Sequence, residues 1–136
     1  MKVAFTTTDN IHIDAHFGWA KQMDFYEVDT EGATFLETVQ FGGELKEDGN
    51  EDKLVPKVAA VEGCTLVYVS AIGGGAASRL LKKNVTPIKA KTESDTISET
   101  LDELIQTLNG SPPPWLRKAL ALGMKKEPVL SFEDDD

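Results

Sequence analysis

Residues 64–83 of the chain read CTLVYVSAIGGGAASRLLKK, and this stretch decides the expected fold. Residues 65–71 are almost wholly apolar, which is typical of a strand buried on both faces of a sheet. Three consecutive glycines follow, and residues 76–83 then have the composition of a short helix. In α/β sheets ligands gather beyond the carboxyl ends of the strands, so we expect a ligand edge at this glycine turn.

Three strands are predicted before this unit and one after it. Residues 2–8, 23–29 and 33–41 are β-rich, and a Thr30-Glu31-Gly32 turn between the last two indicates a hairpin. Residues 85–89 form the final strand, which its proline places near an edge of the sheet.

Apolar residues at helical spacing predict a helix around residues 54–61 and another over residues 92–109, where Thr96 and Glu99 fit a capping box. The expected order is β-β-β-α-β-α-β-α. Strands reached through helices must be parallel crossovers, so we expect an α/β fold with a mixed five-stranded sheet. Its three antiparallel and two parallel strands, flanked by helices, form the ribonuclease H-like layout.

The chain has 136 residues and is expected to divide into three parts. Residues 1–110 form the folded domain, residues 111–126 a proline-rich spacer with a short amphipathic helix, and residues 127–136 an acidic, disordered tail. The apolar runs are too short for a membrane span, and the first residues lack the features of a signal peptide. A single cysteine allows no internal disulfide, so the expected compartment is the cytoplasm.

The charge distribution disfavours one class of partner and permits another. The formal net charge is −9, of which residues 127–136 carry −5. An acidic chain lacks the basic footprint of a nucleic-acid-binding protein. Between Glu62 and Glu93 there is no acid, and the basic residues there are Arg79, Lys82, Lys83, Lys89 and Lys91. This region is either a solvated helix face with a following loop or a site for a compact anion.

His16 is the first candidate ligand because it lies in a loop with Gly18, which lets the chain turn close to a bound group. In an extended segment His12, Asp14 and His16 share a face, so they could form a metal site. Alternatively, His16 caps or hydrogen-bonds its loop and His12 is simply exposed. Cys64 is expected mainly as a small core residue, at the strand end opposite the ligand edge.

The three glycines of this turn can be interpreted in two ways. Free N–H groups at Gly73, Gly74 and Gly75 form an anion-binding nest next to a helix dipole, with Arg79 nearby as a cation. Alternatively, the glycines simply permit a tight turn. The P-loop and dinucleotide fingerprints are both absent. Trp19 is expected to be a core or lid residue.

The sequence favours binding over catalysis. A resident iron–sulfur cluster takes about four thiolates and a structural zinc about four ligands, whereas the chain has one cysteine and two histidines. A two-metal nuclease needs several converging carboxylates, and the glycine turn offers none. No nucleophile-elbow pattern is present, so a hydrolase has little support.

Three groups of residues together resemble a known family. They are Asp14-x-His16-Phe17-Gly18-x-Ala20, then Phe25-Tyr26-Glu27-Val28, then Cys64-x-x-Val67-x-Val69-x-Ala71-Ile72-Gly73-Gly74. This pattern resembles the dinitrogenase iron–molybdenum cofactor biosynthesis family over roughly residues 1–120. The segment PPPWLRKAL, residues 112–120, is similar to the stand-alone NifX-type chains of that family.

The resemblance implies a ribonuclease H-like fold and a non-catalytic carrier. Such a carrier transiently binds an iron–sulfur precursor of the iron–molybdenum cofactor, or the cofactor itself, and passes it to assembly proteins of nitrogen fixation, the cluster donor and scaffold. On this basis we expect His16 to be the direct ligand, Arg79 and the glycine turn to contact the cargo, and Trp19 to shield it. His12 and Cys64 are further metal-ligand candidates.

Two other interpretations stay open. The first is a regulatory or protein-interaction module that carries no cargo and acts on nitrogenase assembly proteins through PPPWLRKAL or the acidic tail. The second is a metal-dependent hydrolase, which predicts turnover with added manganese or magnesium.

Overall fold

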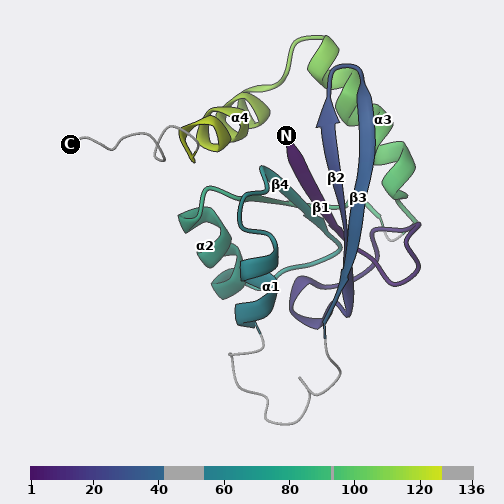
Figure 1. The fold of residues 1–136 in the computed structure, drawn as a ribbon, viewed down its shortest axis with the longest axis vertical. Helices are drawn as coiled ribbons and strands as arrows, with labels where there is room; N and C mark the ends of the chain where they lie inside the picture. Colours follow the sequence, from purple (N-terminus) through teal and green to yellow (C-terminus); the bar gives the residue numbers. More distant parts are fainter. Residues whose placement is uncertain (42–53, 93, 127–136) are drawn as a thin grey trace, which may run out of the picture.

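The computed structural model describes residues 1–41, 54–92 and 94–126. Its five-stranded sheet has the order β3-β2-β1-β4-β5 (Figure 1). The strands are β1 (Lys2–Thr6), β2 (Gln22–Asp29), β3 (Gly32–Gln40), β4 (Leu66–Val69) and β5 (Thr86–Lys89). β1, β2 and β3 pair antiparallel, whereas β1, β4 and β5 pair parallel. The predicted mixed α/β sheet is therefore confirmed.

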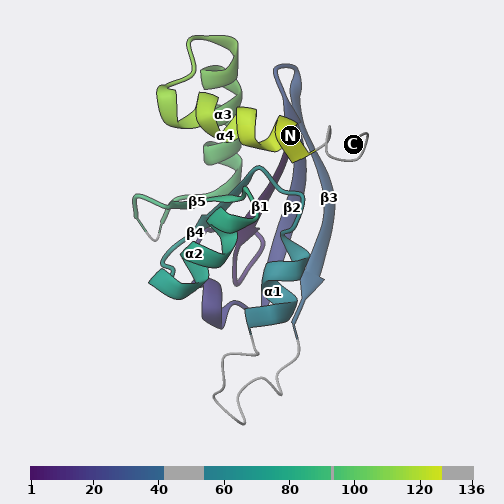
Figure 2. The same ribbon diagram turned by 90° about the vertical axis from the view of Figure 1, so that its left-hand side faces the viewer.

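Helices cover both faces of this sheet. They are α1 (Leu54–Ala60), α2 (Gly74–Lys82), α3 (Ile97–Asn109) and α4 (Pro114–Lys126), with a 3-10 turn η1 (Phe17–Trp19) between β1 and β2. α1 and α2 lie on one side of the sheet and α3 on the other, as views at right angles show (Figures 1 and 2). Among the described residues, none of the helices combines the length and apolar character needed to span a membrane.

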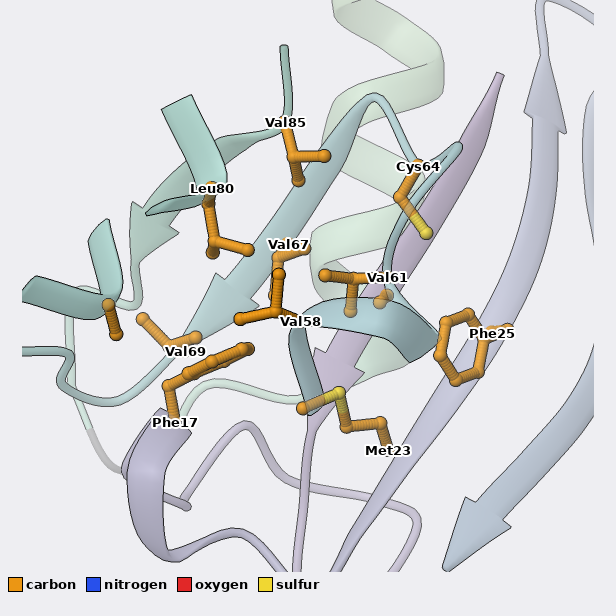
Figure 3. Packing of buried hydrophobic residues seen from close by; sticks show 12 residues of the cluster. Phe17, Met23, Phe25, Val58, Val61, Cys64, Val67, Val69, Leu80 and Val85 are labelled. Carbon is orange, nitrogen blue, oxygen red and sulfur yellow. The ribbon is translucent and has the colours of Figure 1, made fainter. Parts of the chain in front are cut away.

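The first core fills the space between the sheet and helices α1 and α2 (Figure 3). Phe17 of η1 inserts into it and is fully buried, which anchors the loop after β1. In this view Phe17 and Cys64 lie on opposite sides of the cluster. The other buried members are Ala4, Met23, Phe25, Val58, Val61, Val67, Val69, Ala76, Leu80 and Val85.

The second core lies on the face covered by α3 and α4. Phe5 and Tyr68 stack there with ring centroids 5.2 Å apart. Leu116 and Ala119 of α4 are 0% and 2% exposed, so α4 packs on the same domain as the sheet. The acidic tail predicted at residues 127–136 lies outside the described residues.

Two predicted helix starts are wrong. α3 begins at Ile97 rather than residue 92, because Asp95 accepts hydrogen bonds from the Lys91 N–H and the Thr92 hydroxyl and holds a turn before the helix. The Thr96 cap is confirmed, since its hydroxyl accepts from the Glu99 N–H at 3.1 Å. α2 begins within the glycine run, at Gly74 rather than residue 76.

Candidate functional site

His16 caps the short η1 turn. Its Nδ1 accepts a hydrogen bond from the Gly18 N–H at 3.0 Å, while its backbone stays extended. The residue is partly exposed, and the neighbouring Phe17 is buried in the first core. The expected capping role of His16 is therefore present. It leaves Nε2 as the ring nitrogen that can meet a ligand.

Backbone hydrogen bonds join the His16 loop to the carboxyl end of β4. The Ser70 N–H donates to the Ala15 carbonyl at 3.1 Å, and the Phe17 N–H donates to the Ala71 carbonyl at 2.8 Å. His16 and Ala71 thus form an isolated parallel bridge. Because the glycine turn begins two residues after Ala71, the structure brings His16 and that turn to one edge of the sheet.

Gly18 lies next to the His16 ring. A Cβ at Gly18 would lie 3.4 Å from Cε1 and 3.5 Å from Nδ1 of the imidazole. Such a side chain would make ordinary van der Waals contact with the ring, so steric exclusion does not explain glycine at this position.

The glycine turn has no steric need for glycine either. Gly73 is the N-cap of α2 with φ −77°, and an added Cβ at Gly73, Gly74 or Gly75 would meet no atom within 4 Å. None of the three has a positive φ. Glycine is favoured over alanine at an N-cap, so only Gly74 and Gly75 lie where alanine would be the better helix former. The three positions are sterically open to an approaching group.

Arg79 lies in the last turn of α2, whereas the glycines lie at its start. It lines a groove between α1 and α2 together with Val55, Val58, Lys82 and Lys83. The structure therefore places Arg79 on the same helix as the glycine turn but in a separate basic groove.

His12 belongs to a different group from His16. Its Nδ1 lies 2.7 Å from an Asp9 carboxylate oxygen, and the potential ligand atoms of Asp9, His12 and Asp14 lie within 4.8 Å of one another. Asp9 also accepts from the backbone N–H groups of Ile11 and His12, which breaks the extended geometry. The expected shared face of His12, Asp14 and His16 is therefore not formed as a metal-binding group in the described chain.

The same contacts shift two pKa values. Hydrogen bonds from the His12 N–H and imidazole hold the pKa of Asp9 well below its usual range. In return, the hydrogen bond to the Asp9 carboxylate raises the pKa of His12 above its usual value. His12 is thus engaged as a hydrogen-bond partner of Asp9.

The remaining candidates separate clearly by exposure. Cys64 is 0% exposed and belongs to the first core at the amino end of β4, the edge opposite His16. Trp19 is 68% exposed and follows the His16 loop, so the core alternative for this residue is wrong. An exposed indole three residues after the imidazole fits a shielding role.

Lys57 is a neighbour of the site that the sequence did not indicate. It is 1% exposed, and its ammonium group donates to the Gly18 carbonyl at 3.2 Å and lies 5.4 Å from the centroid of the Phe41 ring. The helical pattern of α1 left this lysine outside the apolar stripe. A buried cation therefore sits directly beneath the His16 loop.

Together these residues form a small ligand edge rather than a closed metal cage. It offers one imidazole, the first N–H groups of α2 and an exposed indole, with a buried ammonium behind the loop. Helix N-termini and exposed N–H groups favour anions. The arrangement suits an anionic group that brings most of its own ligands.

Comparisons with known proteins identify the family of the chain. A family model described as dinitrogenase iron-molybdenum cofactor matches residues 1–107. The NifX protein of Herbaspirillum seropedicae is 44% identical over 135 residues, which cover 99% of this chain and 90% of that protein. NifX of Rhodobacter capsulatus is 39% identical over 140 residues, which cover 100% and 87%.

Two further relatives share less of the chain. The FeMo cofactor biosynthesis protein NifB of Bradyrhizobium diazoefficiens is 34% identical over 87 residues, 63% of this chain and 17% of NifB. The crystal structure of PH0822 has a TM-score of 0.60 and 21% identity, covering 78% of this chain and 89% of that one, which shows a shared fold. The sequence match over nearly the full length, joined to the sheet described above, identifies the chain as a NifX-type member of the dinitrogenase iron-molybdenum cofactor family.

Proposed function

We propose that the chain acts in biosynthesis of the nitrogenase iron–molybdenum cofactor as a non-catalytic carrier in the cytoplasm. It transiently holds an iron–sulfur precursor, or the cofactor, and passes it to assembly proteins. Relatives named NifX, NifY and FeMo cofactor biosynthesis protein NifB support this setting. The observation that carries the proposal is the bridge between His16 and Ala71, which joins an imidazole to an open glycine turn.

Weak attachment is what distinguishes a carrier from a resident cluster protein. A resident iron–sulfur cluster takes about four thiolates, whereas this chain has one cysteine and that cysteine is fully buried. A preassembled cluster brings its own bridging sulfides. One imidazole and a few backbone N–H groups can therefore hold it and still release it.

The cap on His16 gives this attachment a specific chemistry. A neutral imidazole whose Nδ1 accepts a hydrogen bond carries its proton on Nε2. With the cap intact, Nε2–H can donate to a cluster sulfide. Direct ligation of iron by Nε2 requires Nδ1 to take the proton instead, which breaks the Gly18 hydrogen bond. Iron ligation by Nε2 and the Gly18 hydrogen bond that orders the loop therefore exclude each other. Release of the cargo restores the capped loop.

Two substitutions at His16 separate the imidazole from the cap. His16→Asn keeps a side-chain oxygen that can accept the Gly18 N–H, whereas His16→Ala removes the cap, which is typically worth about 1 kcal/mol. We expect both variants to lose iron after anaerobic incubation with the precursor cluster and gel filtration. Only His16→Ala should lose stability. The matched control is His12→Asn, which should retain iron because His12 lies in the Asp9 group.

Retention of iron by His16→Asn at the level of the unmodified protein would contradict a direct contact through the imidazole. Thermal unfolding of the same samples shows whether each variant is folded. Anaerobic absorbance provides a second readout, since a loaded carrier acquires broad charge-transfer bands.

The second candidate is a protein-interaction module that uses the PPPWLRKAL segment. Trp115 is 46% exposed, while Leu116 and Ala119 of the same helix are buried on the domain. The exposed indole is thus the part of this segment that can anchor a partner. A module of this kind stays colourless with the cluster present, yet binds an assembly protein and loses that binding in Trp115→Ala.

A further inference from the structure

A second concave site lies on the opposite face of the sheet from the first core. It is a cleft of about 200 Å³ between the edge strand β5 and helices α3 and α4. Its lining shares no residue with the His16 edge or the basic groove. Its lining includes Tyr68, Ile88, Lys89, Thr100, Glu103 and Trp115.

Tyr68 marks the deep end of this cleft. The residue is 9% exposed, and its ring is fixed by stacking on Phe5 at 5.2 Å with an interplanar angle of 13°. Within residues 1–41, 54–92 and 94–126, its hydroxyl group makes no hydrogen bond. A buried hydroxyl of this kind requires a partner from the cleft, either water or a ligand.

Most polar groups in the cleft that have no partner among the described residues are hydrogen-bond donors. In the described part of the chain, the Lys89 ammonium has no carboxylate partner and the Thr100 hydroxyl has no hydrogen bond. The acidic groups are already engaged, since Glu103 lies 3.8 Å from the Lys91 ammonium and Asp95 accepts from Lys91 N–H. The donors of the cleft that lack a partner therefore favour a ligand that is an anionic hydrogen-bond acceptor.

Apolar surface supplies the rest of the lining. Ile88 forms part of the floor, Leu104 and Leu116 are buried in the second core, and Trp115 is exposed at 46%. An apolar cavity of about 150 Å³ is large enough to hold benzene. A cleft of about 200 Å³ thus has room for one ring and a small polar group.

We propose that this cleft binds a small organic carboxylate with a ring-sized apolar body. The carboxylate accepts hydrogen bonds from the Tyr68 hydroxyl and faces the Lys89 ammonium, and the ring lies against Ile88 and Trp115. Burial and the charge of Glu103 raise the pKa of Tyr68 to about 12, so the hydroxyl keeps its proton and donates. This site goes beyond the carrier function and does not depend on it.

Sodium benzoate is the probe, titrated into the ¹⁵N-labelled full chain at constant ionic strength, with benzyl alcohol as the uncharged comparison. We expect saturable shifts of the amide signals of Ala90 and Thr100, and weaker binding of benzyl alcohol. Tyr68→Phe keeps the stacked ring and removes only the hydroxyl, so it should weaken benzoate binding about tenfold, as for a hydrogen bond to a charged group. Lys89→Gln, on an exposed side chain, should weaken binding several-fold without affecting the fold.

Non-saturating shifts, or equal benzoate affinities for the unmodified chain, Tyr68→Phe and Lys89→Gln, would overturn the proposal and leave the cleft as a water site. Signal dispersion in the same spectra shows that each variant is folded. No metal cluster is present in these samples, so a negative result here leaves the carrier proposal intact.

Discussion

Replacing Gly75 by alanine should make the protein more stable and a poorer carrier. Gly75 lies in the first turn of α2 without a positive φ, and the added Cβ would meet no atom within 4 Å. Folding would therefore cost less conformational entropy, with no clash in the native state. If the open glycine turn exists for close approach of cargo, the same methyl group should obstruct that approach.

The size of the stability gain follows from the unfolded state. A Gly→Ala change at an unstrained position typically stabilises by about 0.4–1 kcal/mol. For a domain of this size, that corresponds to a rise in melting temperature of about 1–4 °C. Iron retained after anaerobic loading should fall in the same preparation.

Gly63→Ala is the matched control because an added Cβ at Gly63 would also meet no atom within 4 Å. Its φ is +95°, however, so alanine there would be strained by roughly 1–2 kcal/mol. We expect a lower melting temperature and unchanged iron retention, since Gly63 lies at the other edge of the sheet from His16. Calorimetry and iron analysis on both variants give the comparison.

Two results would refute this reasoning. A fall in the melting temperature of Gly75→Ala would mean that the turn itself requires glycine. Full iron retention by the stabilised Gly75→Ala protein would mean that no cargo approaches the backbone there.

Three further predictions concern the surroundings of the site. Cys64→Ala should destabilise the fully buried position by roughly 1 kcal/mol in chemical denaturation and leave iron retention unchanged. Lys57→Met keeps the apolar stem but removes the donor to the Gly18 carbonyl, so amide hydrogen exchange should accelerate at Gly18 and not in β4. The phenol of Tyr68 should titrate at a pKa of about 12 in a difference spectrum against Tyr68→Phe. The pKa of Tyr68 in the folded protein exceeds the ordinary value of 10.0, so the contribution of the protonated phenol to the free energy of unfolding is complete below about pH 10. Roughly 3 kcal/mol of that free energy is then lost as the pH rises from 10 towards 12.

The order and pairing of the strands could be predicted because local patterns determine them. The apolar run in β4 and the hairpin of β2 and β3 are signals within a few residues. Pro87 in β5 was expected at an edge, and β5 is an edge strand. His16 could be singled out since a glycine-containing loop rarely needs an imidazole.

The parts that failed depend on side-chain contacts that hydrophobic periodicity does not reveal. Asp9 forms an Asx turn in which its carboxylate hydrogen-bonds the N–H and the imidazole of His12. Asn10 has a φ of 65° in this turn, so the extended face expected for His12 and His16 is interrupted. Lys57 occupies a polar position in the helical pattern, yet it is buried because the Gly18 carbonyl and the Phe41 ring lie above it. The cleft at Tyr68 arises only when residues of α3 and α4 come together with β5 in the folded chain.

The bridge between His16 and Ala71 has a mechanical consequence. It is made by main-chain atoms, so the identities of the side chains at Ala15, Ser70 and Ala71 are not what position the ring. Imidazole and glycine turn are attached to one strand and shift as a unit if β4 moves. A protein that binds α2 and shifts it would therefore also shift the His16 imidazole through β4, without contacting the imidazole itself.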